Sequence, residues 1–132
     1  MSENVISVVA ALIRDEAGRV LLVRKRGMAA FMQPNGKRDA GESDVAALAR
    51  EIVEELGCCV DQRTARPLGG FNCASANEPG FALHAAVYAV GVEGAIRPQA
   101  EIDEMVWVDP RALPDLHFAP LTRDHVLPLA MQ

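Results

Sequence analysis

The chain has 132 residues and a mass of 14.2 kDa, which suits one domain and is too little for two independent cores. Half of the residues are hydrophobic and 23% are charged, a balance that excludes an intrinsically disordered chain. The net charge of −5 disfavours a long nucleic acid as partner, because affinity for a phosphate backbone depends on basic surface. We therefore expect a single domain over 1–132, with small anionic molecules still open as ligands.

Membrane insertion and disulfide bonding are not expected. No apolar segment approaches the roughly 20 residues that cross a bilayer, and no basic stretch precedes the first apolar segment as in a signal peptide. Three cysteines cannot all pair, and Cys58 and Cys59 are adjacent, which argues against a disulfide framework. These features predict a cytoplasmic protein without a membrane partner.

The first third of the chain predicts two strands and a long loop. Val5–Ile13 and Val20–Arg26 are apolar, β-branched segments joined by a polar turn, and we expect them to form a hairpin. The following segment, Gly27–Glu42, is rich in turn-forming residues, which excludes a helix or a long strand there.

A helix follows, because Ser43 is a suitable N-cap for a segment that runs to Leu56 and ends at Gly57. Further along, the predicted elements are three strands and a short C-terminal helix interrupted by a proline: Pro67–Ala74, Phe81–Val92, Ile102–Val108 and Pro120–Met131. Strands, one strong helix, more strands and a weak helix indicate an α+β fold with a mixed sheet.

The predicted helix carries a cluster of three carboxylates. At 100° per residue its apolar side chains form one stripe, made of Val45, Leu48, Ile52 and Leu56. Glu51, Glu54 and Glu55 lie beside this stripe at spacings of three and four residues, where like charges repel. A solvated acidic surface is the ordinary interpretation of such a cluster. A bound cation is the other, and oxygen ligands without Cys or His favour Mg²⁺ or Mn²⁺ over Zn²⁺.

A wider spacing decides between these interpretations. Gly36 is followed after five residues by Glu42, and after seven more by Arg50-Glu51-Ile52-Val53-Glu54-Glu55-Leu56-Gly57-Cys58. This pattern resembles the box of the Nudix hydrolase family, Gly-x5-Glu-x7-Arg-Glu-U-x-Glu-Glu-x-Gly-U, where U is a bulky aliphatic residue. Two positions depart from the family pattern. Asn35 stands where a glycine is usual, and Cys58 takes the final aliphatic position.

The resemblance implies a Nudix-type α/β/α sandwich and hydrolysis of a phosphoanhydride bond in a nucleoside diphosphate derivative. In the family the three box glutamates bind divalent cations, so the resemblance assigns Mg²⁺ or Mn²⁺ to Glu51, Glu54 and Glu55, with the backbone carbonyl of Asn35 as a further ligand. Arg50 and Glu42 resemble the ion pair that orients the family's loop against its helix.

The resemblance leaves the general base open between a box glutamate and a carboxylate near the Trp-containing strand. The candidates there are Glu101, which we favour because it precedes the strand, and Glu104. The candidate phosphate-binding residues flank the loop and are Arg24, Arg26, Lys37 and Arg38. Phe31 and Gln33 are the candidates for the pocket of the nucleotide base.

Two alternatives share the fold: a nucleotide-binding or sensor module with weak or no turnover, and an isomerase of isoprenyl diphosphates. The intact carboxylate set disfavours the first. The short chain and the lack of a Cys near the first loop disfavour the second. The nucleotide that is hydrolysed and the choice between monomer and homodimer stay open.

Overall fold

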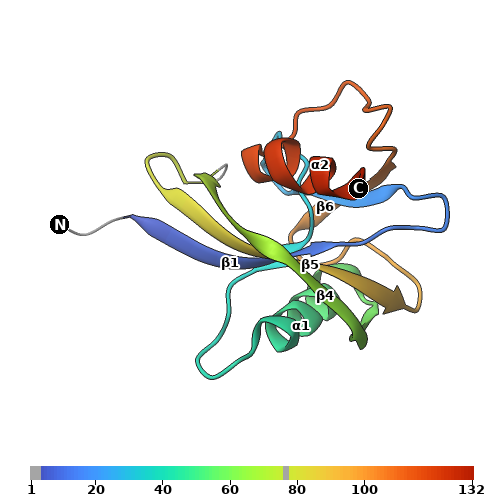
Figure 1. Cartoon of the computed structure of the whole chain (residues 1–132), viewed down its shortest axis with the longest axis horizontal. Helices are drawn as coiled ribbons and strands as arrows, with labels where there is room; N and C mark the ends of the chain where they lie inside the picture. Colours follow the sequence, from blue (N-terminus) through green and yellow to red (C-terminus); the bar gives the residue numbers. More distant parts are fainter. Residues whose placement is uncertain (1–3, 76–77) are drawn as a thin grey trace.

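The computed structural model describes residues 4–75 and 78–132 and has three layers. Figure 1 shows β-strands between the helix α1 (Asp44–Leu56) on one side and the C-terminal helical segment on the other. That segment consists of a π-helical turn, η1 (Thr122–Val126), continued by α2 (Leu127–Ala130). The predicted α/β/α sandwich with a mixed sheet is confirmed.

The strands form two hydrogen-bonded sheets. In chain order they are β1 (Val5–Leu12), β2 (Val20–Lys25), β3 (Asn35–Gly36), β4 (Cys59–Ala74), β5 (Ala82–Glu93) and β6 (Ile102–Val108). One sheet has the order β3-β1-β5-β4, and the other contains β2 and β6. Only the β1–β5 pair is parallel among these neighbours, which makes the larger sheet mixed.

Both faces of the central strands are buried, which explains their continuous apolar sequence. In β1, Val9 and Ala11 pack in the cluster that contains the α1 side chains, whereas Val8 and Ala10 pack with those of η1 and α2. The same alternation places Leu21 of β2 on the α1 side and Leu22 on the opposite side. The two sheets therefore contribute to the same two cores.

The prediction that the first two strands form a hairpin is wrong, although the turn between them is present. Asp15 and Arg19 close the turn, and Leu21 N donates to Ile13 O at 3.0 Å, but β2 then leaves β1 and pairs with β6. The reason is that β1 is already bonded along both edges, to β3 on one side and to β5 on the other. The backbone groups of β2 therefore need another partner.

The predicted helix boundaries are confirmed. Ser43 Oγ accepts a hydrogen bond from Ala46 N at 3.1 Å, and Gly57 ends α1 in the left-handed region with φ of 69°. The buried stripe differs slightly from the expected one, because Ala47 and Glu55 are buried and Val45 is not. A carboxylate therefore lies on the core side of this helix.

The strand after α1 is longer than expected. It begins at Cys59 rather than at Pro67, and its pairing with β5 is interrupted between Asp61 and Arg66 and again between Pro67 and Gly69. The segment 61–66 is mostly polar and is followed by a proline, so the first half of this strand lacks the apolar alternation that predicts a strand.

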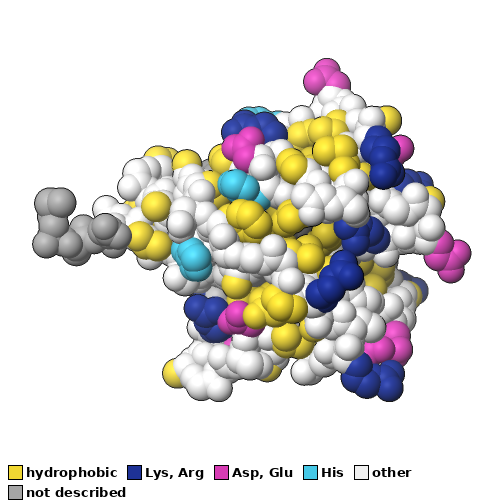
Figure 2. Space-filling model, viewed as in Figure 1, with side chains coloured by type: hydrophobic (Ala, Val, Ile, Leu, Met, Phe, Trp, Pro, Cys, Tyr) yellow, Lys and Arg dark blue, Asp and Glu magenta, His cyan; other side chains and the backbone are white. Residues whose placement is uncertain are grey.

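The surface of the sheet side is partly apolar. Figure 2 shows hydrophobic side chains exposed along the middle of this face, with many of the charged side chains toward its edges. Large hydrophobic side chains that are exposed among the described residues are scattered along the chain: Val5, Val53, Phe81, Leu113 and Met131. Among the described residues, no helix has both the length and the apolar character that crossing a membrane requires.

The loop before α1 is held against the helix at Gly36. A Cβ atom at this position would overlap with Cγ and Cδ of Glu51, so only glycine permits this approach. The φ of Gly36 is not positive, and the requirement is therefore one of space rather than of backbone conformation. The close contact fixes the distance between the loop and the carboxylates of α1.

We predict that Gly36→Ala separates the loop from the helix and lowers the free energy of unfolding by about 1–3 kcal/mol, the usual cost of overpacking. Gly70→Ala is the matched control, because its added Cβ would meet only the end of the His84 side chain, at 3.3 Å. Urea denaturation of both variants measures the difference. Equal stability of the two variants would contradict the packing requirement at Gly36.

Candidate active site

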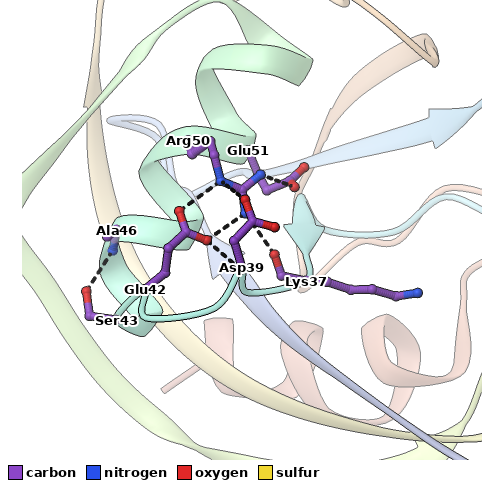
Figure 3. Close-up of polar contacts among 7 residues, drawn as sticks. All are labelled: Lys37, Asp39, Glu42, Ser43, Ala46, Arg50 and Glu51. Atoms are coloured by element: carbon purple, nitrogen blue, oxygen red, sulfur yellow. Dashed lines mark hydrogen bonds and ion pairs between the residues drawn. The ribbon is translucent and has the colours of Figure 1, made fainter.

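A network around Arg50 joins the loop to the helix (Figure 3). Its guanidinium donates to both oxygens of Glu42, at 2.9 and 2.8 Å, to the backbone carbonyl of Lys37 at 2.9 Å and to Glu51 Oε1 at 2.8 Å. These hydrogen bonds from Arg50, with one from Asp39 N, hold the pKa of Glu42 down at about 2. The expected Glu42–Arg50 ion pair is therefore present, and the same arginine also engages Glu51.

Glu55 lies inside the protein. It is 3% exposed, and its Oε1 atom has no hydrogen-bond partner among the described residues. Burial raises the pKa of Glu55 to about 8, with smaller contributions in the same direction from neighbouring glutamates, while the charge of Lys25 opposes the rise. Such a buried, unpartnered oxygen requires an explanation, since most buried polar atoms are paired.

The main pocket lies against this carboxylate. It has a volume of about 250 Å³, and its lining combines two kinds of side chain. The charged ones are four carboxylates and two lysines: Glu51, Glu55, Glu78, Glu101, Lys25 and Lys37. The larger apolar ones include residues of β1 and β5 and the residue before η1: Ile6, Val8, Leu83 and Leu121. A ligand with a charged part and an apolar part fits such a lining.

The two candidate bases near β6 occupy different places. Glu101 lines the pocket, whereas Glu104 is exposed and accepts hydrogen bonds from Arg24 at 3.0 and 3.2 Å. A register shift separates them. Arg24 pairs with Glu104, but the next residue, Lys25, pairs with Ile102, so Asp103 is an extra residue in β6.

The loop that carries Glu101 is anchored at several points. Arg26 N donates to Glu101 O at 2.8 Å, and Gln99 N donates to Glu55 O, at the end of α1, at 2.8 Å. Ala100 has a φ of 52°, the only positive value of a described non-glycine residue. This strained backbone, held by its neighbours, turns the chain between the helix end and Glu101.

No set of three or more His, Cys, Asp or Glu side chains in 4–75 and 78–132 is already arranged to hold a metal ion. Two of the carboxylates are instead paired with cations, Glu51 with Arg50 and Glu101 with Lys25. The donors nevertheless suit a hard divalent cation. Glu55 offers an unpartnered oxygen, and both Glu51 and Asn35 border the same pocket.

Of three other candidates, only Gln33 borders the pocket. Glu54 is exposed on α1, one residue from the buried Glu55. Phe31 is 6% exposed and packs in the core on the α2 side, with the Arg24 guanidinium 5.9 Å from its ring centre. Gln33 is buried, borders the pocket and accepts a hydrogen bond from Thr122 Oγ1 at 2.7 Å.

Of the four candidate phosphate-binding residues, one borders the pocket and three are bonded to other groups. Lys37 borders the pocket. Arg24 is paired with Asp103 and Glu104, Arg26 donates to the backbone of Ala100, and Arg38 is paired with Asp44. These three arginines are therefore engaged elsewhere in this structure.

Sequence reasoning missed Lys25 as a residue of the site. Its side chain borders the pocket, and its Nζ lies 3.3 Å from Glu101 Oε1. A signal was present, because strand alternation places Lys25 on the same side as Leu21 and Val23, which is the α1 side.

The raised pKa of Glu55 predicts a dependence of stability on pH in the metal-free protein. Between about pH 4.5 and 8 the folded protein keeps a proton on Glu55 that the unfolded chain has lost, so stability falls as pH rises through this range. Glu55→Gln stays neutral. Above pH 8 its free energy of unfolding should exceed that of the parent by a few kcal/mol, the order of magnitude that corresponds to the raised pKa of Glu55. Near pH 4.5 the two proteins should be similarly stable.

Urea denaturation in EDTA at several pH values measures this difference. Glu54→Gln is the matched control for removal of a charge, because it changes the neighbouring exposed position. A Glu55→Gln advantage that stays constant with pH would contradict the buried, protonated carboxyl.

Known proteins resemble this chain in sequence. A family model described as NUDIX domain matches residues 4–129. The chain is 41% identical over 61 residues to an 8-oxo-dGTP diphosphatase of Haemophilus influenzae, a match over 43% of this chain and 45% of the relative. It is 40% identical over 114 residues to an octanoyltransferase of Myxococcus xanthus, over 80% of this chain and 30% of the relative. The chain thus spans less than half the length of these curated relatives.

The fold is also shared with solved structures. The crystal structure of a MutT NUDIX hydrolase from Burkholderia pseudomallei matches with a TM-score of 0.77 and 24% identity, over 98% of this chain and 97% of the other. At this identity the likeness concerns the fold. The family match over 4–129 confirms the predicted family. The chain therefore belongs to the Nudix hydrolase family, as the spacing from Gly36 to Cys58 indicates.

Proposed function

We propose that this protein is a divalent-metal-dependent pyrophosphohydrolase. Its substrate is a nucleoside diphosphate derivative, nucleoside triphosphates included, and water attacks at phosphorus. The observation that carries the proposal is the composition of the pocket, where Glu51, Glu55 and Glu101 meet an apolar wall. The carboxylates suit the metal and phosphate part of such a substrate, and the apolar side chains suit its nucleoside.

Mg²⁺ or Mn²⁺ is the proposed cofactor, held by Glu51, Glu54, Glu55 and the backbone carbonyl of Asn35. The unpartnered oxygen of Glu55 and the close approach of Gly36 to Glu51 support this assignment. When bound, the cation neutralises charge on the phosphate oxygens and favours attack by water. Arg50 keeps Glu51 and the loop in place, and the side chain of Lys37 is available for the phosphates.

Glu101 is the proposed general base. It borders the pocket at the end of a loop, and 58% of its side chain is exposed, so an attacking water can reach its carboxylate. Glu104 belongs instead to an ion-pair cluster with Arg24 and Asp103, outside the pocket lining. The carboxylate of Glu101 would accept a proton of the water as its oxygen bonds to phosphorus, while the phosphoanhydride bond breaks and its bridging oxygen leaves with the other phosphate-containing product.

The nucleoside is proposed to lie near Gln33. The hydrogen bond from Thr122 fixes the orientation of this buried amide, whose nitrogen then faces a ligand as a donor. An oxidised purine nucleotide is the first substrate to test, because one relative is named an 8-oxo-dGTP diphosphatase.

A panel of nucleotides incubated with Mg²⁺ in ¹⁸O-labelled water tests the reaction. Hydrolysis at phosphorus places the label in one of the phosphate-containing products and requires the metal. Tight binding of a nucleotide with no turnover of any member of the panel would contradict the proposal and favour the sensor alternative.

We predict that Glu101→Gln lowers kcat by about two orders of magnitude or more, with little change in KM, because a general base acts mainly in the transition state. Glu104→Gln is the matched control, since it makes the same change three residues away in an exposed ion pair. Steady-state kinetics with one substrate compare the two. A crippled Glu104→Gln beside an active Glu101→Gln would reverse the assignment.

A further inference from the structure

Lys25 reaches the carboxylates because of the irregular pairing at the end of β2. Arg24 faces Glu104 across the strand pair, and the register shift that follows brings Lys25 opposite Ile102. Lys25 therefore continues the α1-facing row of Leu21 and Val23, and its side chain ends in the pocket.

The ammonium group of Lys25 lies among carboxylates. Its Nζ is 3.3 Å from Glu101 Oε1, and no other ion pair of Lys25 occurs in the part of the chain that the structure describes. The Lys25 side chain is 20% exposed and that of Glu101 is 58% exposed, so the contact lies where the pocket opens to solvent. Lys25 also acts on the buried Glu55, where its positive charge favours the ionised carboxylate and the neighbouring glutamates disfavour it.

The two cations that are paired with carboxylates of the site, Arg50 and Lys25, differ in their attachment. Arg50 is fixed by Glu42 and by the backbone of Lys37 as well as by Glu51, so it cannot leave without disrupting the loop. Lys25 has one carboxylate partner and a flexible four-carbon side chain. Only Lys25 is therefore able to move aside while the loop and helix keep their positions.

We propose that Lys25 is an internal counter-cation that is paired with Glu101 beside the carboxylate cluster in the metal-free protein and opposes the binding of the divalent cation there. The inference rests on the proposed metal-dependent function. Entry of the divalent cation displaces the ammonium group from Glu101. Lys25 thereby stabilises the metal-free protein and weakens metal binding, which makes it a positioning residue for the carboxylates.

The test is the affinity for Mn²⁺ alone, measured by electron paramagnetic resonance without a nucleotide. Lys25→Met and Lys25→Gln should each bind Mn²⁺ more tightly than the parent, on the order of three- to tenfold, because a competing positive charge is gone. Lys25→Arg keeps the charge and should not bind more tightly. The metal-free Lys25→Met protein should melt at a lower temperature and gain more from Mn²⁺ than the parent does.

Two controls make the result specific. Lys37→Met removes an equal charge from the same pocket, at a lysine that has no ion pair among the described residues, and should tighten binding less. In a Glu101→Gln background Lys25→Met should lose most of its effect, since the carboxylate it holds is already neutral.

The outcomes separate this inference from the proposed function. If the parent binds Mn²⁺ and neither Lys25→Met nor Lys25→Gln binds it more tightly, the inference is wrong and the metal site stands. An equal gain in Lys37→Met would also overturn it, because the effect would then be one of overall charge. If none of the proteins binds Mn²⁺, the metal site itself is wrong. A lysine that served only to bind substrate would leave these affinities unchanged.

Discussion

The buried carboxyl group of Glu55 is the constraint on which the site depends. A charge in this position is costly, and the protein places the group beside a pocket with one oxygen unpartnered. The surrounding structure keeps it there. Gln99 N bonds to the carbonyl of Glu55 itself, Arg97 N bonds to the carbonyl of Leu56, and Gly57 ends the helix in the left-handed region. These contacts fix the backbone position from which the Glu55 side chain enters the protein.

Two further carboxylates of the site, Glu51 and Glu101, are each paired with a cation, and the two cations differ in how many contacts hold them. Arg50 combines a structural role, through Glu42 and the backbone of Lys37, with a hold on Glu51. Lys25 holds Glu101 from the other side of the pocket through a single contact. On this account Arg50 and Lys25 neutralise carboxylates of the site in the metal-free protein, and a divalent cation takes over part of that role.

Local sequence predicted the parts of this site that depend on short-range spacing. Ser43 and Gly57 define the helix, and the interval from Gly36 to the box glutamates identifies the family. The burial of Glu55 was not predictable from the helical projection, because it depends on which side of α1 the sheet covers. The Ile102–Val108 strand lacks a simple alternation for a similar reason. A bulge at Asp103 places Ile102, Met105 and Trp107 on one face and brings Glu101 beside Lys25. The failure of the β1–β2 hairpin likewise depends on pairings between distant segments.

The location of the metal is tested most directly by anomalous diffraction. Crystals of the protein grown with Mn²⁺ and a non-hydrolysable nucleotide would be measured at wavelengths on both sides of the manganese absorption edge. The account predicts an anomalous peak within coordination distance of carboxylate oxygens of Glu51 and Glu55, with the Lys25 ammonium group moved away from Glu101. A peak elsewhere, or no peak at this cluster when the nucleotide is fully ordered, would contradict it.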